Sequence, residues 1–248
     1  MVRNKRINKV IILAGGKGTR ISEYSKTIPK PMIEVGGIPI IVHIIRIYKK
    51  YGIKNFYLAL GYKGNYFKKY FTKQKLKKLS LENINLNFIN TGVNTMTGGR
   101  LKKFSKYLDS NEDFLFTYGD GVSNININKL IKFHLANKKI LTVTAVKPPA
   151  RFGALNINGN LVSYFKEKSQ SDEGWINGGF FVANKKILNF IKGDNTFFER
   201  EPMEIISRNK NLVAYKHDKF WQSMDTARDK EFLDKLFKKK SFFLNKLI

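Results

Sequence analysis

The chain has 248 residues, 42% of them hydrophobic and 13% aromatic, which is enough apolar material for one large α/β domain or for one domain with an appendage. It contains no cysteine, which excludes disulfides, thiolate metal sites and a cysteine nucleophile. Its formal net charge of +27 suits a partner that is either nucleic acid or a polyphosphate substrate.

The positive charge is spread along the chain, and Lys, Asn and Ile are frequent throughout. A coding bias toward these residues is therefore an alternative to a functional explanation of the high positive charge. The sequence has no zinc-finger spacing, no RNA-binding strand motif and no recognition-helix signature. We therefore expect no nucleic acid partner. It also has no run of about 18 apolar residues and no signal-peptide pattern, which predicts a cytoplasmic protein with no membrane partner.

The first stretch that indicates chemistry covers residues 10–31. Apolar, β-branched residues typical of a buried strand lead into the loop Ala14–Arg20, with the sequence AGGKGTR. Glycines let a backbone turn tightly and approach a ligand, and successive amides in such a loop can converge on an anion. Thr19, Arg20 and Lys30 add donors and positive charge. The pattern predicts a phosphate-binding loop at the carboxyl end of a strand.

Two familiar phosphate-binding motifs do not fit this loop. The dinucleotide fingerprint G-x-G-x-x-G fails because residues 16–20 are followed by Ile21 instead of glycine. The P-loop motif G-x-x-x-x-G-K-[ST] fails because Lys17 is followed by Gly18. Both motifs are therefore rejected. A glycine-rich loop that only turns the chain is an alternative, but it leaves the flanking Arg20 and Lys30 unexplained.

Strand and helix patterns alternate along the first half of the chain. We expect strands at 32–35, 55–60, 84–89, 114–118 and 140–146, and helices at 39–51, 101–108 and 128–137. The alternation implies βαβ units and a mostly parallel sheet, whose ligands bind beyond the carboxyl ends of its strands. The AGGKGTR loop, the polar segment 91–100 and Asp120 all follow predicted strands, so we expect them to meet at that edge.

The second half begins with a predicted hairpin around Asn158-Gly159, a strong turn signal between two short strands. We then expect strands at 175–182 and 212–217, and helices at 185–191, at 198–208 and from about residue 227. We interpret this half as an extension of the same sheet. The predicted fold is a Rossmann-like α/β fold, with a mixed, mostly parallel sheet and helices on both faces.

Several motifs, in order along the chain, resemble those of the sugar-phosphate nucleotidyltransferase family. They are LAGGKGTR, KPM, GGxPI, GYKG, TGxxTMTGGRL, FTYGDGV, RFGAL, INGGFF and FWQSMDT. TMTGGRL, FTYGDGV and INGGFF resemble the cytidylyl-transferring branch of that family, and the similarity runs from about residue 9 to 238. It implies the nucleotide-diphospho-sugar transferase fold in a single domain, residues 1–248. The nucleotide-binding half would cover about 9–147 and the sugar-phosphate-binding half about 148–238, followed by a basic tail at 239–248.

The resemblance implies Mg²⁺-dependent transfer of a cytidylyl group from CTP to α-D-glucose 1-phosphate, giving CDP-glucose and diphosphate for deoxysugar and surface polysaccharide synthesis. The attacking phosphate oxygen is already largely ionised at neutral pH, because the second pKa of a phosphomonoester is about 6. No general base or covalent nucleophile is then needed. The reaction needs positioning and charge neutralisation around direct in-line attack on the α-phosphorus.

The family's functional positions can be carried over residue by residue. Its nucleotide contacts fall on Leu13, Ala14, Gly15, Gly16, Gly18, Thr19, Arg20, Lys30, Thr95, Arg100 and Gly119. Its sugar-phosphate contacts fall on Gly153, Glu167, Lys168, Asn177 and Gly178, and its paired magnesium ligands fall on Asp120 and Asp225. We expect the catalytic residues to be Arg20 on the leaving pyrophosphate, Lys30 on the phosphates near the reacting centre, and Lys168 on the incoming sugar phosphate.

Some departures leave alternatives open. Serine replaces a family proline at Ser169 and Ser223, and a segment that relatives often carry is absent between Phe71 and Thr91. The missing segment leaves the oligomeric state open, although we expect a homo-oligomer. A uridylyl- or thymidylyltransferase is an alternative, because pyrimidine choice depends on few contacts in the 91–100 loop. A non-catalytic nucleotide- or nucleic-acid-binding module is a second alternative, which the retained aspartate pair argues against.

Overall fold

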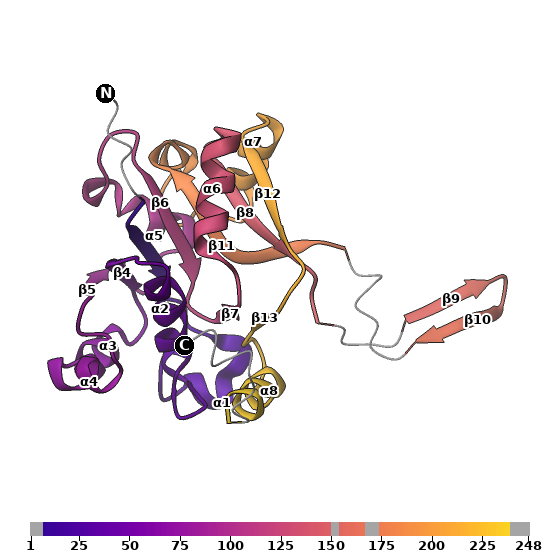
Figure 1. Ribbon diagram of the computed structural model, residues 1–248, viewed down its shortest axis with the longest axis horizontal. Helices are drawn as coiled ribbons and strands as arrows, with labels where there is room; N and C mark the ends of the chain where they lie inside the picture. The colour runs from indigo at the N-terminus through magenta and orange to yellow at the C-terminus, as the bar shows by residue number, and fades with distance from the viewer. Residues whose placement is uncertain (1–6, 150–153, 167–173, 239–248) are drawn as a thin grey trace.

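The computed structural model of the protein describes residues 7–149, 154–166 and 174–238. A seven-stranded sheet with the strand order β12-β8-β11-β6-β1-β4-β5 forms its centre (Figure 1). The strands are β1 (Lys9–Leu13), β4 (Asn55–Leu60), β5 (Asn85–Asn90), β6 (Asp113–Tyr118), β8 (Leu141–Val146), β11 (Ile176–Asn184) and β12 (Leu212–His217). Strand β11 is antiparallel to both of its neighbours, and the other pairs are parallel. The predicted mixed, mostly parallel sheet is confirmed.

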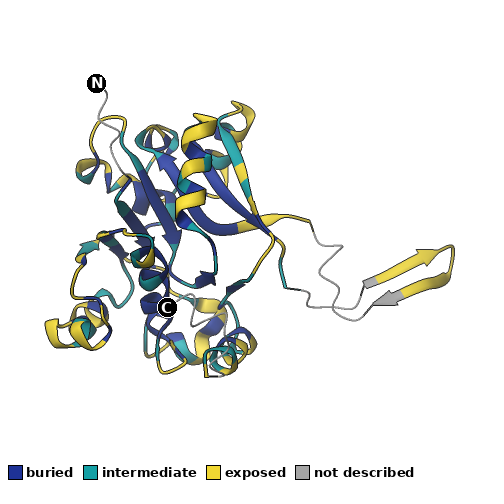
Figure 2. Ribbon diagram, in the orientation of Figure 1, coloured by how far each residue is buried: buried dark blue, intermediate teal, exposed yellow. Residues whose placement is uncertain are grey.

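Helices cover both faces of this sheet because successive strand residues point to opposite faces. In β1, Val10 and Ile12 belong to one apolar cluster, which also includes residues of α2 (Ile40–Lys50) and α6 (Ile127–Asn137). Ile11 and Leu13 belong to a second cluster, with residues of α5 (Thr97–Lys102) and α7 (Glu201–Arg208). Figure 2 shows the central strands buried, with exposed residues on the outer helix surfaces. The prediction of helices on both faces is confirmed.

Shorter elements complete the chain around this core. The remaining α-helices are α1 (Ser22–Ser25), α3 (Gly64–Tyr70), α4 (Lys73–Lys78) and α8 (Ala227–Lys238), and the 3-10 helices are η1 (Thr19–Ile21), η2 (Lys30–Met32), η3 (Ser105–Tyr107) and η4 (Lys185–Phe190). Two short strands, β2 (Glu34–Val35) and β3 (Ile38–Pro39), pair with each other. The short strands β7 (Gly121–Ser123) and β13 (Trp221–Ser223) form a second such pair. No helix in the described ranges is long and apolar enough to cross a membrane.

The helix predicted at 101–108 is shifted toward the N-terminus in the structure, where α5 begins at Thr97 and ends at Lys102. The backbone amides of Gly98 and Gly99, which open this helix, donate to the carbonyl oxygen of Thr196 at 2.9 and 3.3 Å. A contact from a distant part of the chain thus satisfies the first turn, and it overrides the low helix propensity of the glycine pair. Two other predicted helices also differ, since 185–191 forms the 3-10 helix η4 and α7 starts at 201 instead of 198.

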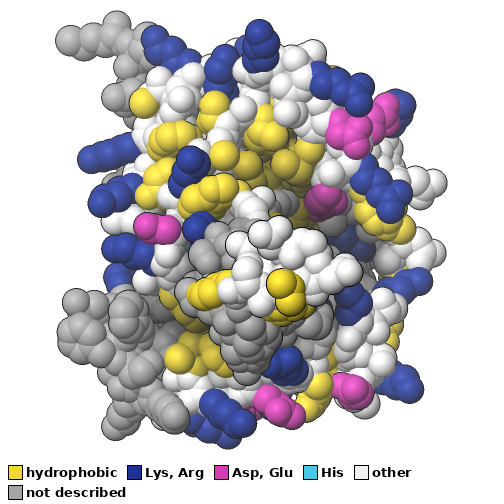
Figure 3. Space-filling model, turned by 90° about the vertical axis from the view of Figure 1, so that its right-hand side faces the viewer, with side chains coloured by type: hydrophobic (Ala, Val, Ile, Leu, Met, Phe, Trp, Pro, Cys, Tyr) yellow, Lys and Arg dark blue, Asp and Glu magenta, His cyan; other side chains and the backbone are white. Residues whose placement is uncertain are grey.

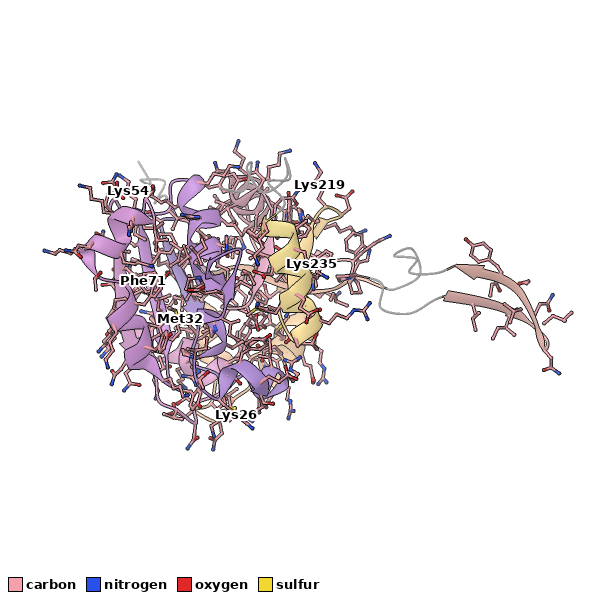
Figure 4. All side chains as sticks on the ribbon, turned by 90° about the horizontal axis from the view of Figure 1, so that it is seen from below. Lys26, Met32, Lys54, Phe71, Lys219 and Lys235 are labelled. Carbon is pink, nitrogen blue, oxygen red and sulfur yellow. The ribbon has the colours of Figure 1, made fainter. Side chains whose placement is uncertain are left out.

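The predicted hairpin is confirmed as β9 (Ala154–Asn158) and β10 (Leu161–Lys166), but it forms a separate two-stranded sheet. The expectation that the whole second half extends the central sheet is therefore wrong for these strands, although β11 and β12 do join it. The register agrees with this: Ile176 of β11 pairs directly with Val146 of β8, so β9 and β10, which lie between them in the sequence, are not inserted between these two strands. Figures 1 and 4 show the hairpin extending away from the body of the molecule.

Candidate active site

A cavity of about 760 Å³ lies at the edge of the sheet where β1 and β6 end. Strand β11 begins at the same edge, because it runs antiparallel to β6 and pairs Phe180 with Thr117. The first residues of β11, Asn177–Gly179, therefore line the cavity together with the ends of β1 and β6, although they come from the other half of the chain. The cavity wall is completed by α5 and by the segment 221–225.

The loop that follows β1 forms one wall of the cavity. Its Gly18 has φ +65°, a left-handed conformation that favours glycine, and its carbonyl oxygen accepts a hydrogen bond from the Ser25 hydroxyl at 2.8 Å. A side chain at Gly18 would also lie 2.8 Å from Cβ of Lys30. No hydrogen bond joins the amides of residues 15–18 to another part of the chain that the structure describes. The loop therefore offers unpaired amide donors to an anion.

Lys30 is the central cation of the cavity. It is buried, and its Nζ lies 2.6 Å from Oδ2 of Asp120 and 2.9 Å from Oδ1 of Asp225. Arg20 reaches the same Asp225 oxygen at 3.2 Å, with a side chain that is 77% exposed. The two predicted catalytic cations that the structure describes and the two predicted metal ligands thus form one cluster.

This cluster sets the charge states of its members. Burial alone would lower the pKa of Lys30, but the charges and hydrogen bonds of Asp120 and Asp225 raise it above its ordinary value. Burial alone would raise the pKa of Asp225, but Lys30, Arg20 and the Ser223 hydroxyl hold it below its ordinary value. At neutral pH Lys30 is therefore an ammonium and Asp225 a carboxylate.

Asp120 and Asp225 meet because β7 and β13 pair with each other. Ser223 pairs with Gly121, and the Met224 amide donates to the Asp120 carbonyl oxygen at 2.9 Å. The loop after β13 is then fixed by Asp229, whose carboxylate accepts from the amides of Asp225 and Thr226 at 3.1 and 2.9 Å. The backbone at Asp120 is therefore fixed by its hydrogen bond with Met224, and the backbone at Asp225 is fixed by the Asp229 carboxylate.

The aspartate pair fits a hard divalent cation. Both carboxylates reach one point, the Lys30 ammonium, and both line the cavity with part of their surface exposed. Magnesium usually takes one or two carboxylates and completes its octahedron with water and substrate phosphate oxygens. Within the ranges that the structure describes, no group of three or more His, Cys, Asp or Glu residues could hold a metal without such help. The donor set therefore suits a cation that arrives with phosphate.

Arg100 contacts the loop that follows β1 and also lines the cavity. It is 3% exposed, and its guanidinium donates to the Gly15 carbonyl at 2.9 Å, to the Thr91 hydroxyl at 2.6 Å and to the Gly92 carbonyl at 2.7 Å. A Cβ at Gly15 would lie 2.2 Å from Nη1 of Arg100, so this position requires glycine. Arg100 thus ties the end of β1 to the loop after β5, a supporting role that the predicted nucleotide contact did not include.

Replacing Arg100 with methionine is expected to lower the free energy of unfolding by about 3 kcal/mol, because buried carbonyl oxygens lose their charged donor. Chemical denaturation followed by circular dichroism measures the change. Arg208→Met is the matched control, because that arginine is exposed and only forms a 3.4 Å contact with Glu204 on the surface of α7. Equal stability of the two variants would contradict the supporting role of Arg100.

The remaining predicted site residues divide into two groups. Those that line the cavity are Leu13, Ala14, Gly15, Gly16, Gly18, Thr19, Thr95, Gly119, Asn177 and Gly178. Thr95 is buried and its hydroxyl contacts Asp194 at 3.3 Å. Gly119 donates its amide to the Leu13 carbonyl, which joins the ends of β1 and β6. Gly153, Glu167 and Lys168 lie outside the described residues, so their assignment to the sugar-phosphate side stays a prediction.

The structure adds cavity residues that the sequence did not single out. Tyr118 and Trp221 line the wall, and the Trp221 indole donates to the Gly178 carbonyl at 2.7 Å. Tyr118 lies in the motif FTYGDGV and Trp221 in FWQSMDT, so an aromatic residue in the same motif as a predicted aspartate was the available signal. Glu199 also lines the cavity, but it precedes a helix in a segment with no motif, and no local signal indicates it.

Comparison with known proteins relates this chain to enzymes of sugar activation. The family described as Nucleotidyl transferase matches residues 9–230. The chain is 43% identical to the glucose-1-phosphate cytidylyltransferase of Salmonella typhimurium, over 93% of this chain and 96% of that protein. It is 40% identical to a probable glucose-1-phosphate cytidylyltransferase of Bacillus subtilis, over 89% of this chain and 92% of that protein.

Solved structures share the fold. HddC from Yersinia pseudotuberculosis superposes with a TM-score of 0.71 at 26% identity, over 93% of this chain and all of that chain. A UDP-glucose pyrophosphorylase superposes with a TM-score of 0.72 at 16% identity, over 95% of this chain and all of that chain, which shows the fold alone. The predicted nucleotide-diphospho-sugar transferase fold is confirmed.

Proposed function

Because this chain belongs to the nucleotidyl transferase family, we propose that it is an enzyme that transfers a cytidylyl group from CTP to α-D-glucose 1-phosphate, giving CDP-glucose and diphosphate. The observation that carries the proposal is the identity of 43% with a glucose-1-phosphate cytidylyltransferase over nearly the full length of both chains. The cavity supports the same reaction class, since an amide-rich loop, buried Lys30 and paired carboxylates are arranged for two phosphorylated substrates.

The residues of the cavity would act through position and charge. We propose that the unpaired amides of residues 15–18 hold the triphosphate, with Arg20 neutralising the charge that develops on the departing diphosphate. Lys30, fixed between two carboxylates, would stabilise charge on the phosphate that is transferred. Lys168 would bind the sugar phosphate and align its oxygen for in-line attack, and no residue needs to remove a proton.

Mg²⁺ is the proposed metal, and Asp120 and Asp225 would hold it together with phosphate oxygens. When bound, it would neutralise phosphate charge and hold the triphosphate in one geometry. Asn177 and Gly178 would form the sugar side of the cavity, where the Trp221 indole holds the Gly178 carbonyl. The division into a nucleotide-binding half at about 9–147 and a sugar-phosphate-binding half at about 148–238 is part of this proposal.

The proposal also covers the setting of the enzyme. We propose that it works in the cytoplasm, because its nucleotide substrate is available there, and that it forms a homo-oligomer.

The hairpin β9–β10 supports an oligomer, because Leu155, Ile157 and Val162 are each more than half exposed and Ile157 pairs with Val162. An isolated two-stranded hairpin is marginally stable in water, so a covering surface would stabilise it. Figure 3 shows Lys and Arg side chains scattered around the face that carries the hairpin, which agrees with charge spread along the sequence.

The first experiment is a substrate panel. The purified protein is incubated with glucose 1-phosphate, Mg²⁺ and CTP, UTP, dTTP, ATP or GTP in turn, and released diphosphate is measured. We expect release with CTP alone. Release with UTP or dTTP would keep the reaction class and assign the chain to the uridylyl or thymidylyl alternative. If a folded sample releases no diphosphate with any of these nucleotides, the panel is repeated with other sugar 1-phosphates, and no release there either would overturn the proposed enzyme.

A further inference from the structure

Glu199 holds two hydroxyl groups on the wall of the cavity. Its Oε1 accepts a hydrogen bond from the Tyr118 hydroxyl at 2.6 Å, and its Oε2 accepts one from the Thr97 hydroxyl at 2.6 Å. Tyr118 is the last residue of β6, and Thr97 is the first residue of α5. One carboxylate therefore joins the strand that leads to Asp120 with the helix that follows the predicted base-binding loop.

The hydrogen bonds continue from Tyr118 to the sugar side of the cavity. The Asn177 side-chain amide donates to the Tyr118 hydroxyl oxygen at 3.3 Å, and the Asn177 side-chain oxygen accepts from the Gly179 amide at 2.8 Å. The complete network runs from α5 through Glu199 and Tyr118 to the first residues of β11. It thus crosses from the proposed nucleotide half of the chain to the proposed sugar-phosphate half.

The carboxylate fixes the direction of the hydrogen bonds made by the Tyr118 and Thr97 hydroxyls. An ionised carboxylate only accepts, so the hydroxyls of Tyr118 and Thr97 must donate to it. The Tyr118 oxygen then has only lone pairs to offer, which selects the NH₂ end of the Asn177 amide and leaves its oxygen for Gly179. Burial and the nearby Glu199 charge raise the pKa of Tyr118 well above its ordinary value, so this residue remains a donor. Without a carboxylate at 199, the Tyr118 hydroxyl would lose the acceptor that fixes its proton, and the Gly179 amide would be the remaining restraint on the Asn177 side chain among the contacts that the structure describes.

The charge of Glu199 is unusual for a cavity that receives anions. Among the described residues that line the cavity, the other acids are Asp120 and Asp225, which pair with Lys30. Glu199 forms no ion pair with a described cation, and its two oxygens contact hydroxyl groups only. A carboxylate that neither pairs with a cation nor joins the aspartate pair repels phosphate from its own part of the wall. It suits a region that receives the neutral hydroxyl groups of a sugar.

We propose that Glu199 is a positioning residue that orients the Asn177 amide, through Tyr118, toward the hydroxyl groups of the sugar phosphate. This inference rests on the proposed function, because Asn177 is assigned to the sugar side there. Thr97 keeps a second restraint, since its hydroxyl oxygen also accepts from the Phe198 amide at 2.9 Å. Loss of the Glu199 carboxylate should therefore affect the sugar side more than the nucleotide side.

The test compares Glu199→Gln, Tyr118→Phe and the double variant with the wild-type protein, using steady-state kinetics with CTP and glucose 1-phosphate. Each single variant is expected to raise KM for glucose 1-phosphate about tenfold, the size of one lost hydrogen bond to a charged group, with a smaller change in KM for CTP. The double variant should be no worse than either single one, because both act through the same network. Glu201→Gln is the matched control: that carboxylate pairs with Lys192 at 2.6 Å on the surface and should leave both KM values unchanged.

Several outcomes would overturn the inference. Additive effects of the two substitutions would show that Glu199 and Tyr118 act separately. Lowered thermal stability with unchanged KM values would show a purely structural role. A Glu199→Gln variant that matches Glu201→Gln would show no role at all, whereas Tyr118→Phe tests the network independently if Glu199→Gln does not fold. A wild-type protein that neither turns over nor binds glucose 1-phosphate in calorimetry would instead overturn the proposed function, and the inference with it.

Discussion

Replacing Lys30 with alanine is expected to lower kcat about a hundredfold or more, the size typical of a lost electrostatic stabiliser. Lys30 is buried between Asp120 and Asp225, so no water-exposed lysine can take its place. Its raised pKa keeps it charged throughout the neutral range, so the effect should not depend on pH between about 6 and 9. Diphosphate release at saturating substrates measures the loss.

The control for this variant must separate catalysis from folding. Removing Lys30 leaves two carboxylates facing each other, which also costs stability, so circular dichroism must first show that the variant is folded. Lys26→Ala is the matched substitution: Lys26 is an exposed lysine close in sequence, labelled in Figure 4 at the surface of the molecule. Near wild-type turnover in a folded Lys30→Ala variant would remove this residue from the catalytic site.

Replacing either Asp120 or Asp225 with asparagine is expected to reduce turnover by a similar factor, about a hundredfold. Asparagine keeps the shape and one acceptor oxygen but removes the charge that a divalent cation and Lys30 both need. The two variants should also require a higher Mg²⁺ concentration for half-maximal rate, which distinguishes loss of a metal ligand from loss of Lys30 orientation. A magnesium titration of the rate measures both quantities.

Asp218→Asn provides the comparison for the aspartate pair, because Asp218 is exposed and does not line the cavity. If either site variant kept the wild-type rate and the wild-type magnesium dependence, that aspartate would not be a metal ligand.

Asp225 also makes the stability of the folded protein depend on pH. Its pKa is lowered in the folded state, so its ionised form stabilises the protein above its unfolded pKa, and that stability is lost as the pH falls through the folded value.

Local sequence patterns were sufficient to predict the central sheet. Strands β1, β4 and β6 consist mainly of apolar residues, and each is followed by a segment that contains glycine. The ends of these strands and the candidate ligands could therefore be placed together at one edge of the sheet. The resemblance then supplied Asp225, which has no local signal of its own. Its position depends on the pairing of β13 with β7, and no periodicity in either short strand predicts that pairing.

Other features depend on contacts between distant segments, which is why the sequence alone did not predict them. The start of α5 is set by a carbonyl oxygen of Thr196, and the role of Arg100 is set by carbonyl oxygens after β1 and β5. The antiparallel direction of β11 brings Asn177 to the cavity, although the strand pattern itself carries no direction. Glu199 belongs to the cavity for the same reason, since its partners are residues of β6 and α5.

The pairing of β7 with β13 has a consequence for how the enzyme is made. The contact of Lys30 with Asp225 spans 195 residues, so the charged cluster is among the most non-local features of the chain. A nascent chain can form the amide-rich loop and β1 early, but the carboxylate pair is complete only after residue 225 has left the ribosome. Synthesis at about 5–20 residues per second delays that moment by ten seconds or more, and premature termination before β13 would yield a protein without its aspartate pair. The charged cluster is thus completed only after most of residues 1–225 have been synthesised.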